Sequence, residues 1–247
     1  MTKLLSSIIG KILEVIYLTV SKIGTEPKSI SYFAISILIL TLIYKLVMMP
    51  VTISNIKMQK LNAKFQPELK KLEAKYKHDP QLYQQKVMEF QREMGYNPLA
   101  SCLPMLIQVL IIWALFPVMR EPLKYLELSK DINLNFFWIK DITVANSKDL
   151  ILPILLALTQ FLFTKMMTPK MPQDDNNNNP MQGMNFAMQY AMPIMFFFFA
   201  RNYQPALSIY WITGNIIEMI FRFFIMKNDD EEEVVLNNKD SKKGNKK

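Results

Sequence analysis

The feature that most constrains this chain is a series of five apolar, charge-poor stretches. They cover residues 29–56, 95–119, 150–164, 186–200 and 202–225. Three of the stretches contain no charged residue, the first contains only Lys45, and the last contains Glu218 and Arg222. A membrane-spanning helix needs roughly 20 predominantly apolar residues. The sequence therefore predicts an all-α membrane protein with five transmembrane helices.

The connections between these stretches complete the predicted layout. The cores 150–164 and 186–200 are shorter than a usual span, so a locally thin bilayer or tilted neighbouring helices is expected. In chain order we predict an interfacial amphipathic helix at 1–24, transmembrane helix 1 at 28–56, a cytoplasmic helical hairpin at 57–94, transmembrane helix 2 at 97–119, an outer connection at 120–149, transmembrane helix 3 at 150–168, a cytoplasmic loop at 169–184, transmembrane helix 4 at 185–200, transmembrane helix 5 at 205–226 and a disordered cytoplasmic tail at 227–247.

The N-terminal segment has the pattern of an amphipathic helix. Apolar residues between Leu4 and Ile23 recur at the spacing of one helical face, with Lys3, Lys11 and Lys22 opposite. This pattern predicts a helix that lies in the membrane interface. A secretory signal peptide is the alternative, although charges interrupt the apolar run and no small-residue cleavage site closes it.

The insert at residues 57–94 is polar and carries two helical runs on either side of Pro80. Proline is favoured at the first position of a helix and glycine just after the last. We therefore predict an antiparallel hairpin whose second helix begins at Pro80 and ends before Gly95. Its surplus of basic residues either secures the topology or attracts anionic lipid and the machinery of nascent chains.

The distribution of basic residues predicts the orientation. With the N-terminus outside, the inner connections hold 17 lysines and arginines and the outer connections hold 10. Lysine and arginine are enriched in cytoplasmic connections. The counts therefore favour an N-out, C-in arrangement.

Several function classes need residues that this chain lacks. It has one cysteine, Cys102, and one histidine, His78, so neither a disulfide framework nor the usual His/Cys metal site can form. The five stretches contain no paired aspartates, no Ser/His pair and no His-Glu-x-x-His motif. We therefore predict no metal, no cofactor and no enzymatic activity.

Lys45 is the most informative single residue, because it lies inside the first apolar stretch. A lysine at the centre of a transmembrane helix costs roughly 2.5 to 3.5 kcal/mol, so it must face protein, water or an interface. Either Lys45 extends to the cytoplasmic headgroups, or it lines a water-filled cavity open to the cytoplasm. Thr41 and Thr52 share its helical face.

On the second, third and fifth spans, polar residues recur at helical spacing and form one stripe on each helix. Such stripes either line a shared cavity or form ordinary hydrogen bonds between helices. Glu218 either pairs locally with Arg222 or pairs with Lys45 across the bundle. The candidate residues of a hydrophilic substrate groove are Lys45, Thr41, Gln108, Thr159, Gln160, Ser208, Tyr210, Trp211, Asn215 and Glu218.

An ordered set of motifs carries a family resemblance. The set comprises Lys45-Leu46-Val47-Met48-Met49-Pro50-Val51-Thr52, Gln66-Pro67, Gly95-Tyr96-Asn97-Pro98, Cys102-Leu103-Pro104 with Gln108, Leu152-Pro153-Ile154, and Pro205-Ala206-Leu207-Ser208-Ile209-Tyr210-Trp211 with Asn215. In this order, over residues 28–226, it resembles the bacterial YidC family of membrane insertases, which has relatives in mitochondria and chloroplasts. The resemblance implies five core helices, a cytoplasmic hairpin, and a groove open to cytoplasm and lipid but closed outside.

One residue departs from the family's pattern. Where the family usually has an arginine, five residues before the Pro50-equivalent proline, this chain has Lys45. Lysine keeps the charge but cannot form the bidentate pair that a guanidinium forms with a carboxylate. Attraction of acidic substrate groups is therefore expected to persist without that geometry.

The predicted function is that of an insertase in the bacterial plasma membrane. Its partners would be nascent membrane proteins and the lipid bilayer, with a ribosome and a Sec-type translocon as candidate partners and no DNA. The alternative is a small-solute or ion transporter or channel. Only six glycines occur, and no repeated pair of interrupted spans is found, which disfavours that alternative.

Overall fold

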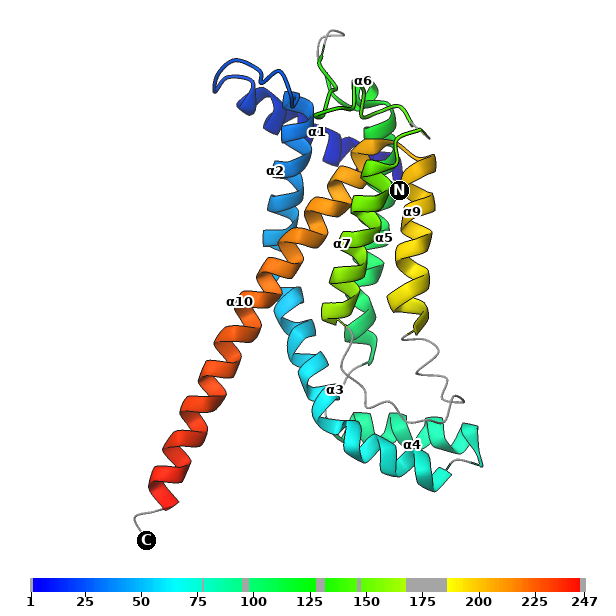
Figure 1. Ribbon diagram of the computed structural model, residues 1–247, viewed down its shortest axis with the longest axis vertical. Coiled ribbons are helices and arrows are strands. Elements are labelled where there is room, and N and C mark those ends of the chain that lie inside the picture. Colours follow the sequence, from blue (N-terminus) through cyan, green and yellow to red (C-terminus); the bar gives the residue numbers. More distant parts are fainter. Residues whose placement is uncertain are drawn as a thin grey trace. The chain divides into compact units, whose positions relative to one another are not determined.

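The computed structural model describes residues 2–76, 78–94, 98–127, 132–145, 148–167 and 186–244. Over these ranges the regular elements are helices, and isolated bridges join Phe136 to Ile30 and Ile139 without forming a strand (Figure 1). The all-α class predicted from the sequence is confirmed. The chain divides into two compact units, the first made of Met1–Met48 with Cys102–Ile216 and the second of Met49–Ser101 with Ile217–Lys247.

The first unit holds most of the apolar helices. Its elements are α1 (Thr2–Val20), α2 (Tyr32–Val47), most of α5 (Pro98–Arg120), α6 (Pro122–Tyr125), α7 (Ile151–Met167), the π-helix η1 (Ala187–Ala191), α9 (Met192–Asn202) and the first part of α10 (Pro205–Gly244). Helix α1 packs across α2 and against α6, and α7 lies beside α9 and η1 (Figure 1).

Helix α1 buries one face and exposes the other. Ser6, Gly10 and Leu13 are buried, and the Ser6 hydroxyl donates to the carbonyl of Ala114 at 2.9 Å. A Cβ atom on Gly10 would lie 2.8 Å from the carbonyl oxygen of Tyr125, so only glycine fits at this contact. The exposed apolar residues of α1 are Leu4, Leu5, Ile8, Ile12, Val15 and Leu18.

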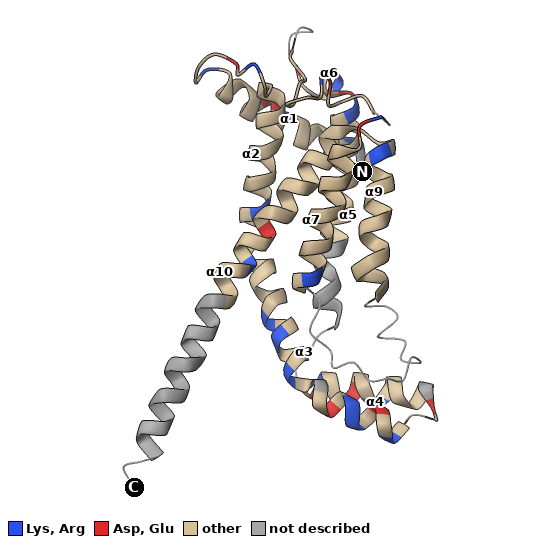
Figure 2. Ribbon diagram, in the orientation of Figure 1, with Lys and Arg blue, Asp and Glu red and all other residues tan. Residues whose placement is uncertain are grey.

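The first unit keeps polar groups inside while exposing large apolar ones. Its core includes Phe33, Ile37 and Leu115, and the buried residues also include the amides of Gln160 and Asn215. Large apolar side chains on the helices face outward, among them Trp113, Leu158, Ile194, Met195 and Phe198. Figure 2 shows the middle of α7 and of α9 without charged residues. Exposed apolar surface of this extent is typical of a protein that contacts a membrane.

The lengths of the described helices support fewer spans than the sequence predicts. By length and composition, α10 over Pro205–Met226 could cross a membrane, and Tyr32–Val47 with Met49–Phe65 qualify if they are counted as one broken span. Leu106–Arg120 and Ile151–Met167 are shorter apolar helices. At 1.5 Å per residue, α7 is about 26 Å long, somewhat less than the roughly 30 Å hydrocarbon core of a typical bilayer. The five-span arrangement remains a prediction.

The helix predicted at 28–56 is interrupted at Met48. Helix α2 begins after Ser31, whose hydroxyl accepts from the amide of Ala34 at 3.2 Å, and it ends at Val47. Pro50 has no amide hydrogen, and its ring conflicts with the carbonyl four residues earlier. A new helix, α3 (Met49–Tyr76), begins directly after the break.

The second unit contains the helical hairpin formed by α3 and α4 (Pro80–Glu93). The Asp79 carboxylate caps α4 by accepting from the amide of Leu82 at 3.0 Å, and Pro80 occupies the first turn as predicted. The rings of Phe65 and Phe90 meet edge to face, with centroids 5.5 Å apart. The predicted end at Gly95 lies outside the described residues. Lysine, arginine, aspartate and glutamate residues are spread along both helices (Figure 2).

The C-terminal segment differs from the disordered tail predicted for residues 227–247. Helix α10 continues to Gly244. Extending an existing helix avoids the cost of nucleation, and the glutamates and lysines of this segment favour helix. The prediction of disorder rests on the acidic and basic residues of the tail and on its few apolar residues, and it does not consider a helix that continues from the preceding span.

Candidate functional site

Lys45 lies in the last turn of α2 and is half-buried. Its ammonium nitrogen is 5.8 Å from the centre of the Tyr44 ring. Its stem crosses α10 at Gly214, where an added Cβ atom would lie 3.3 Å from Lys45 Cε and 3.8 Å from Thr41 Cγ2. Thr41 is buried, and its hydroxyl donates to the carbonyl of Ile37 in its own helix at 2.7 Å. Lys45 and Thr41 therefore share one face of α2, as predicted, and α10 covers that face.

A chain of hydrogen bonds joins three helices of the first unit. The Tyr44 hydroxyl donates to Gln108 Oε1 at 3.3 Å, and Gln108 Nε2 donates to the Tyr210 hydroxyl at 3.0 Å. Tyr210 is buried, while Tyr44 and Gln108 are half-buried. Gln108 and Tyr210, both candidate groove residues, are thus joined by a direct hydrogen bond. Side chains of α2, α5 and α10 meet in this series of hydrogen bonds.

A second polar contact joins α7 and α10. Asn215 Nδ2 donates to Gln160 Oε1 at 3.0 Å, and both side chains are buried. Gln160 Nε2 lies 4.0 Å from the sulfur of Met192, a weak acceptor. The polar stripes predicted on the third and fifth spans therefore meet each other, as the hydrogen-bond interpretation of such stripes expects.

Three predicted groove residues have other surroundings. Ser208 is buried with an exposed fraction of 1%, and its hydroxyl oxygen has no hydrogen-bond partner in the described part of the chain. The Thr159 hydroxyl donates to the carbonyl of Leu155 in its own helix at 2.9 Å. The Trp211 ring packs edge to face on Phe196, with centroids 4.4 Å apart. These contacts of Thr159 and Trp211 do not include Gln108 or Asn215.

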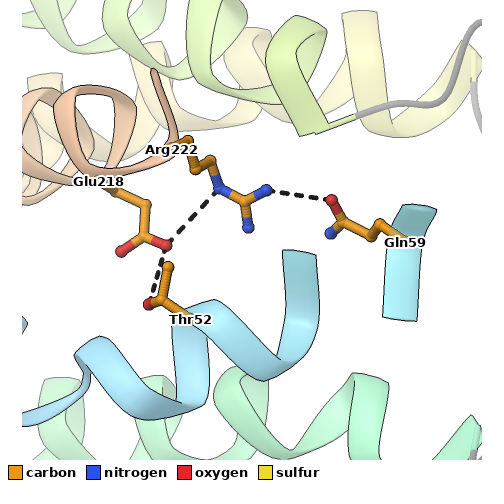
Figure 3. A network of polar contacts seen from close by, with 4 residues as sticks. All are labelled: Thr52, Gln59, Glu218 and Arg222. Atoms are coloured by element: carbon orange, nitrogen blue, oxygen red, sulfur yellow. Dashed lines mark hydrogen bonds and ion pairs between the residues drawn. The ribbon is translucent and has the colours of Figure 1, made fainter. Parts of the chain in front are cut away.

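Glu218 belongs to a polar network within the second unit (Figure 3). Its Oε1 accepts from the Thr52 hydroxyl at 3.1 Å and lies 3.6 Å from Arg222 Nε. Arg222 Nη1 donates to Gln59 Oε1 at 3.0 Å. Glu218, Arg222 and Thr52 are all buried. The local Glu218–Arg222 pair weighed from the sequence is therefore present, while a pair between Glu218 and Lys45 would join the two units and remains a hypothesis.

The predicted groove does not include Tyr44, Met192, Gln59 or Gly214, which take part in these contacts. Tyr44 and Met192 look like ordinary apolar positions of a span, and Gln59 lies in the segment predicted as hairpin. Gly214 carries no side chain whose polarity could mark it. The signal for Tyr44 is its hydroxyl, because a tyrosine in an apolar helix usually finds a hydrogen-bond partner for that group.

The chemistry available to these residues is binding rather than bond making. The two groups in the first unit offer amides, hydroxyls and one cation. Among the described residues, no group of three or more His, Cys, Asp or Glu side chains is placed to hold a metal ion. Amides and hydroxyls that can donate and accept suit a peptide backbone or a polar side chain.

Helices that keep amides inside and present apolar side chains outward define a helical membrane protein. A family model described as 60Kd inner membrane protein matches residues 26–232. The chain belongs to this family, the YidC family of membrane protein insertases, as the resemblance of the motifs predicted. It is not known as a family of enzymes.

Individual relatives agree with the family model. A protein of Clostridium tetani named membrane protein insertase YidC is 35% identical over 205 residues, which are 83% of this chain and 86% of the relative. One of Fusobacterium nucleatum with the same name is 34% identical over 206 residues, covering 83% of this chain and 91% of the relative. One of Oceanobacillus iheyensis is 36% identical over 200 residues, covering 78% and 74%.

Proposed function

We propose that this protein is a membrane insertase that assists the insertion and folding of transmembrane segments. Family membership supports this function, and the names of the relatives imply nascent membrane proteins as substrates and the membrane as the place of action. None of the observations favours the small-solute transporter weighed as the alternative.

The observation that carries the mechanism is the polar interior of the first unit. A polar segment crossing hydrocarbon must satisfy its backbone groups, each of which costs several kcal/mol if it is left without a partner. Gln108, Gln160 and Asn215 offer amides to such groups, and Lys45 offers a positive charge. These residues would form a groove in which the leading polar segment of a substrate exchanges water for protein hydrogen bonds.

The apolar part of the substrate would supply the driving force. It would slide along the outward apolar side chains of α7 and α10, which include Leu158 and Ile216. Burial of apolar surface in lipid is favourable at roughly 25 cal/mol per Å², so a full transmembrane helix releases enough free energy without any covalent step. The short α7 supports a locally thinned bilayer, which would shorten the path of the polar segment.

The arrangement in the membrane is part of the same proposal. We place the protein in the bacterial plasma membrane with five spans, the N-terminus outside and the C-terminus inside, as the basic residues favour. Helix α1 would lie in the outer interface. The basic hairpin would face the cytoplasm, where a ribosome and a Sec-type translocon are candidate partners.

The function is tested by reconstituting the purified protein in liposomes. A short single-span substrate is expected to insert faster than into vesicles without protein, because the polar groups lower the barrier for its leading segment. The measurement is protease protection of the substrate over time, and heat-denatured protein at the same lipid ratio is the control. Equal insertion rates in all vesicles would contradict the insertase function and favour the alternative of a small-solute transporter.

The topology is tested by cysteine labelling. In a Cys102→Ser background, a cysteine in place of the exposed Lys75 should react with an impermeant maleimide only from the cytoplasmic side, because the hairpin is proposed to lie there. A cysteine in place of the exposed Lys140 should react only from outside. Labelling both after detergent treatment controls for reactivity. The reverse pattern would overturn the orientation.

A further inference from the structure

Gly214 lies inside α10 and is buried. Glycine is the least favourable residue in a helix interior apart from proline, because it loses the most conformational freedom on folding. At contacts between membrane helices, a glycine lets a neighbouring helix approach closely. For Gly214, the neighbouring helix is α2.

The side chain of Lys45 fills the space beside Gly214. An added Cβ atom would lie 3.3 Å from Lys45 Cε and 4.0 Å from Lys45 Nζ. A separation of 3.3 Å is shorter than ordinary van der Waals contact between carbon atoms. The lysine stem therefore passes close over bare backbone of α10, and both residues belong to the first unit.

This contact limits where the ammonium group can lie. A lysine stem is flexible, with four carbons and no fixed fork. On one side, Gly214 lets the stem approach α10. On the other, the Tyr44 ring centre is 5.8 Å from Lys45 Nζ. Asn215 follows Gly214 directly and bonds Gln160, so a lysine held at Gly214 lies at the polar part of α10.

We infer that Gly214 is a positioning residue for Lys45: the missing side chain lets the lysine stem lie against α10 and holds its charge in the groove. This inference rests on the insertase function proposed above and deepens it.

Two substitutions test the inference by filling the space in steps. Gly214→Ala adds a Cβ atom that displaces Lys45 Cε slightly, and Gly214→Leu occupies the place of the stem. Gly24→Ala is the matched control, since no atom lies within 4 Å of the added Cβ atom there. The thermal midpoint of Gly214→Ala is expected not to fall, because alanine favours a helix more than glycine does.

The first readout is insertion into liposomes. Gly214→Ala should slow insertion by about twofold to tenfold, the lower part of the range that coupling between touching residues spans. Gly214→Leu should slow it as much as Lys45→Ala does. In the Lys45→Ala background, Gly214→Ala should have no further effect, because its action requires the lysine. Independent, multiplying effects of the two substitutions would overturn the inference.

The second readout does not depend on insertion. Acylation of Lys45 by a small N-hydroxysuccinimide ester, measured by mass spectrometry against the exposed Lys140 of the same protein, should change in both Gly214 variants and stay unchanged in Gly24→Ala. An unchanged rate in Gly214→Leu would overturn the inference even if insertion were affected. If the wild-type protein fails to accelerate insertion, the proposed function falls, and acylation alone still decides whether Gly214 positions Lys45.

Discussion

Lys45→Glu should slow insertion by at least about tenfold, because two unit charges 4 Å apart interact by about 1 kcal/mol in water and about 4 kcal/mol at a protein surface, and the sign is reversed. The half-buried position of Lys45 against α10 strengthens the expectation, since partly buried charges are screened less by salt. The rate of substrate insertion into liposomes, and growth of cells that depend on this protein, would measure the effect.

The matched series separates charge from shape. Lys45→Arg should retain insertion, and Lys45→Ala should lose it for some substrates but less severely than Lys45→Glu. The same charge reversal at the exposed Lys140 should leave insertion unchanged. All variants should keep the wild-type thermal midpoint. If Lys45→Glu inserted substrates at the wild-type rate, Lys45 would only anchor its helix at the headgroups. The proposed role of its charge in the groove would then be wrong.

Arg222→Ala should lower the stability of the folded protein by about 3 kcal/mol, because it leaves a buried carboxylate without the guanidinium that pairs with it. Glu218 would keep its hydrogen bond from the Thr52 hydroxyl, and the Gln59 side-chain oxygen would lose the hydrogen bond that Arg222 donates (Figure 3). At roughly 2 to 4 °C per kcal/mol, the thermal midpoint should fall by about 6 to 12 °C. A fluorescence-detected thermal scan in detergent would measure it.

The control for this prediction replaces both charges. Glu218→Gln with Arg222→Met should be closer to wild type than Arg222→Ala, since a buried ion pair can often be exchanged for neutral groups at little cost. Arg201→Ala removes an exposed arginine and should have little effect. If Arg222→Ala were as stable as wild type, the network in Figure 3 would contribute nothing measurable to folding.

The sequence predicted polar stripes on the helices, but it did not predict which residues of these stripes bond each other or how deeply they are buried. Periodicity placed Gln160 and Asn215 on the inner stripes of their helices, and these two residues bond each other. It could not show that Ser208 lies fully buried or that the Thr159 hydroxyl bonds its own helix, because a stripe gives the direction of a side chain and not its partner.

The break in the first span and the length of the last helix also escaped the sequence analysis. Pro50 marks the break at Met48, but proline is tolerated in membrane helices often enough that hydropathy alone favoured a continuous span. The role of Gly214 cannot be derived from the sequence, because its contact with Lys45 depends on a helix that is far away in the chain.

Ionic strength should act differently on the two units. The bonds among Tyr44, Gln108 and Tyr210 join neutral groups, so dissolved salt has no net charge to screen there. The hairpin instead carries exposed ion pairs such as Glu68–Lys71, 2.8 Å apart, which salt weakens over a Debye length of about 8 Å at physiological strength. An insertion rate that falls as salt rises would therefore report mainly on the hairpin surface, because the half-buried Lys45 is screened less, and the interior amides would keep their contacts at every salt concentration.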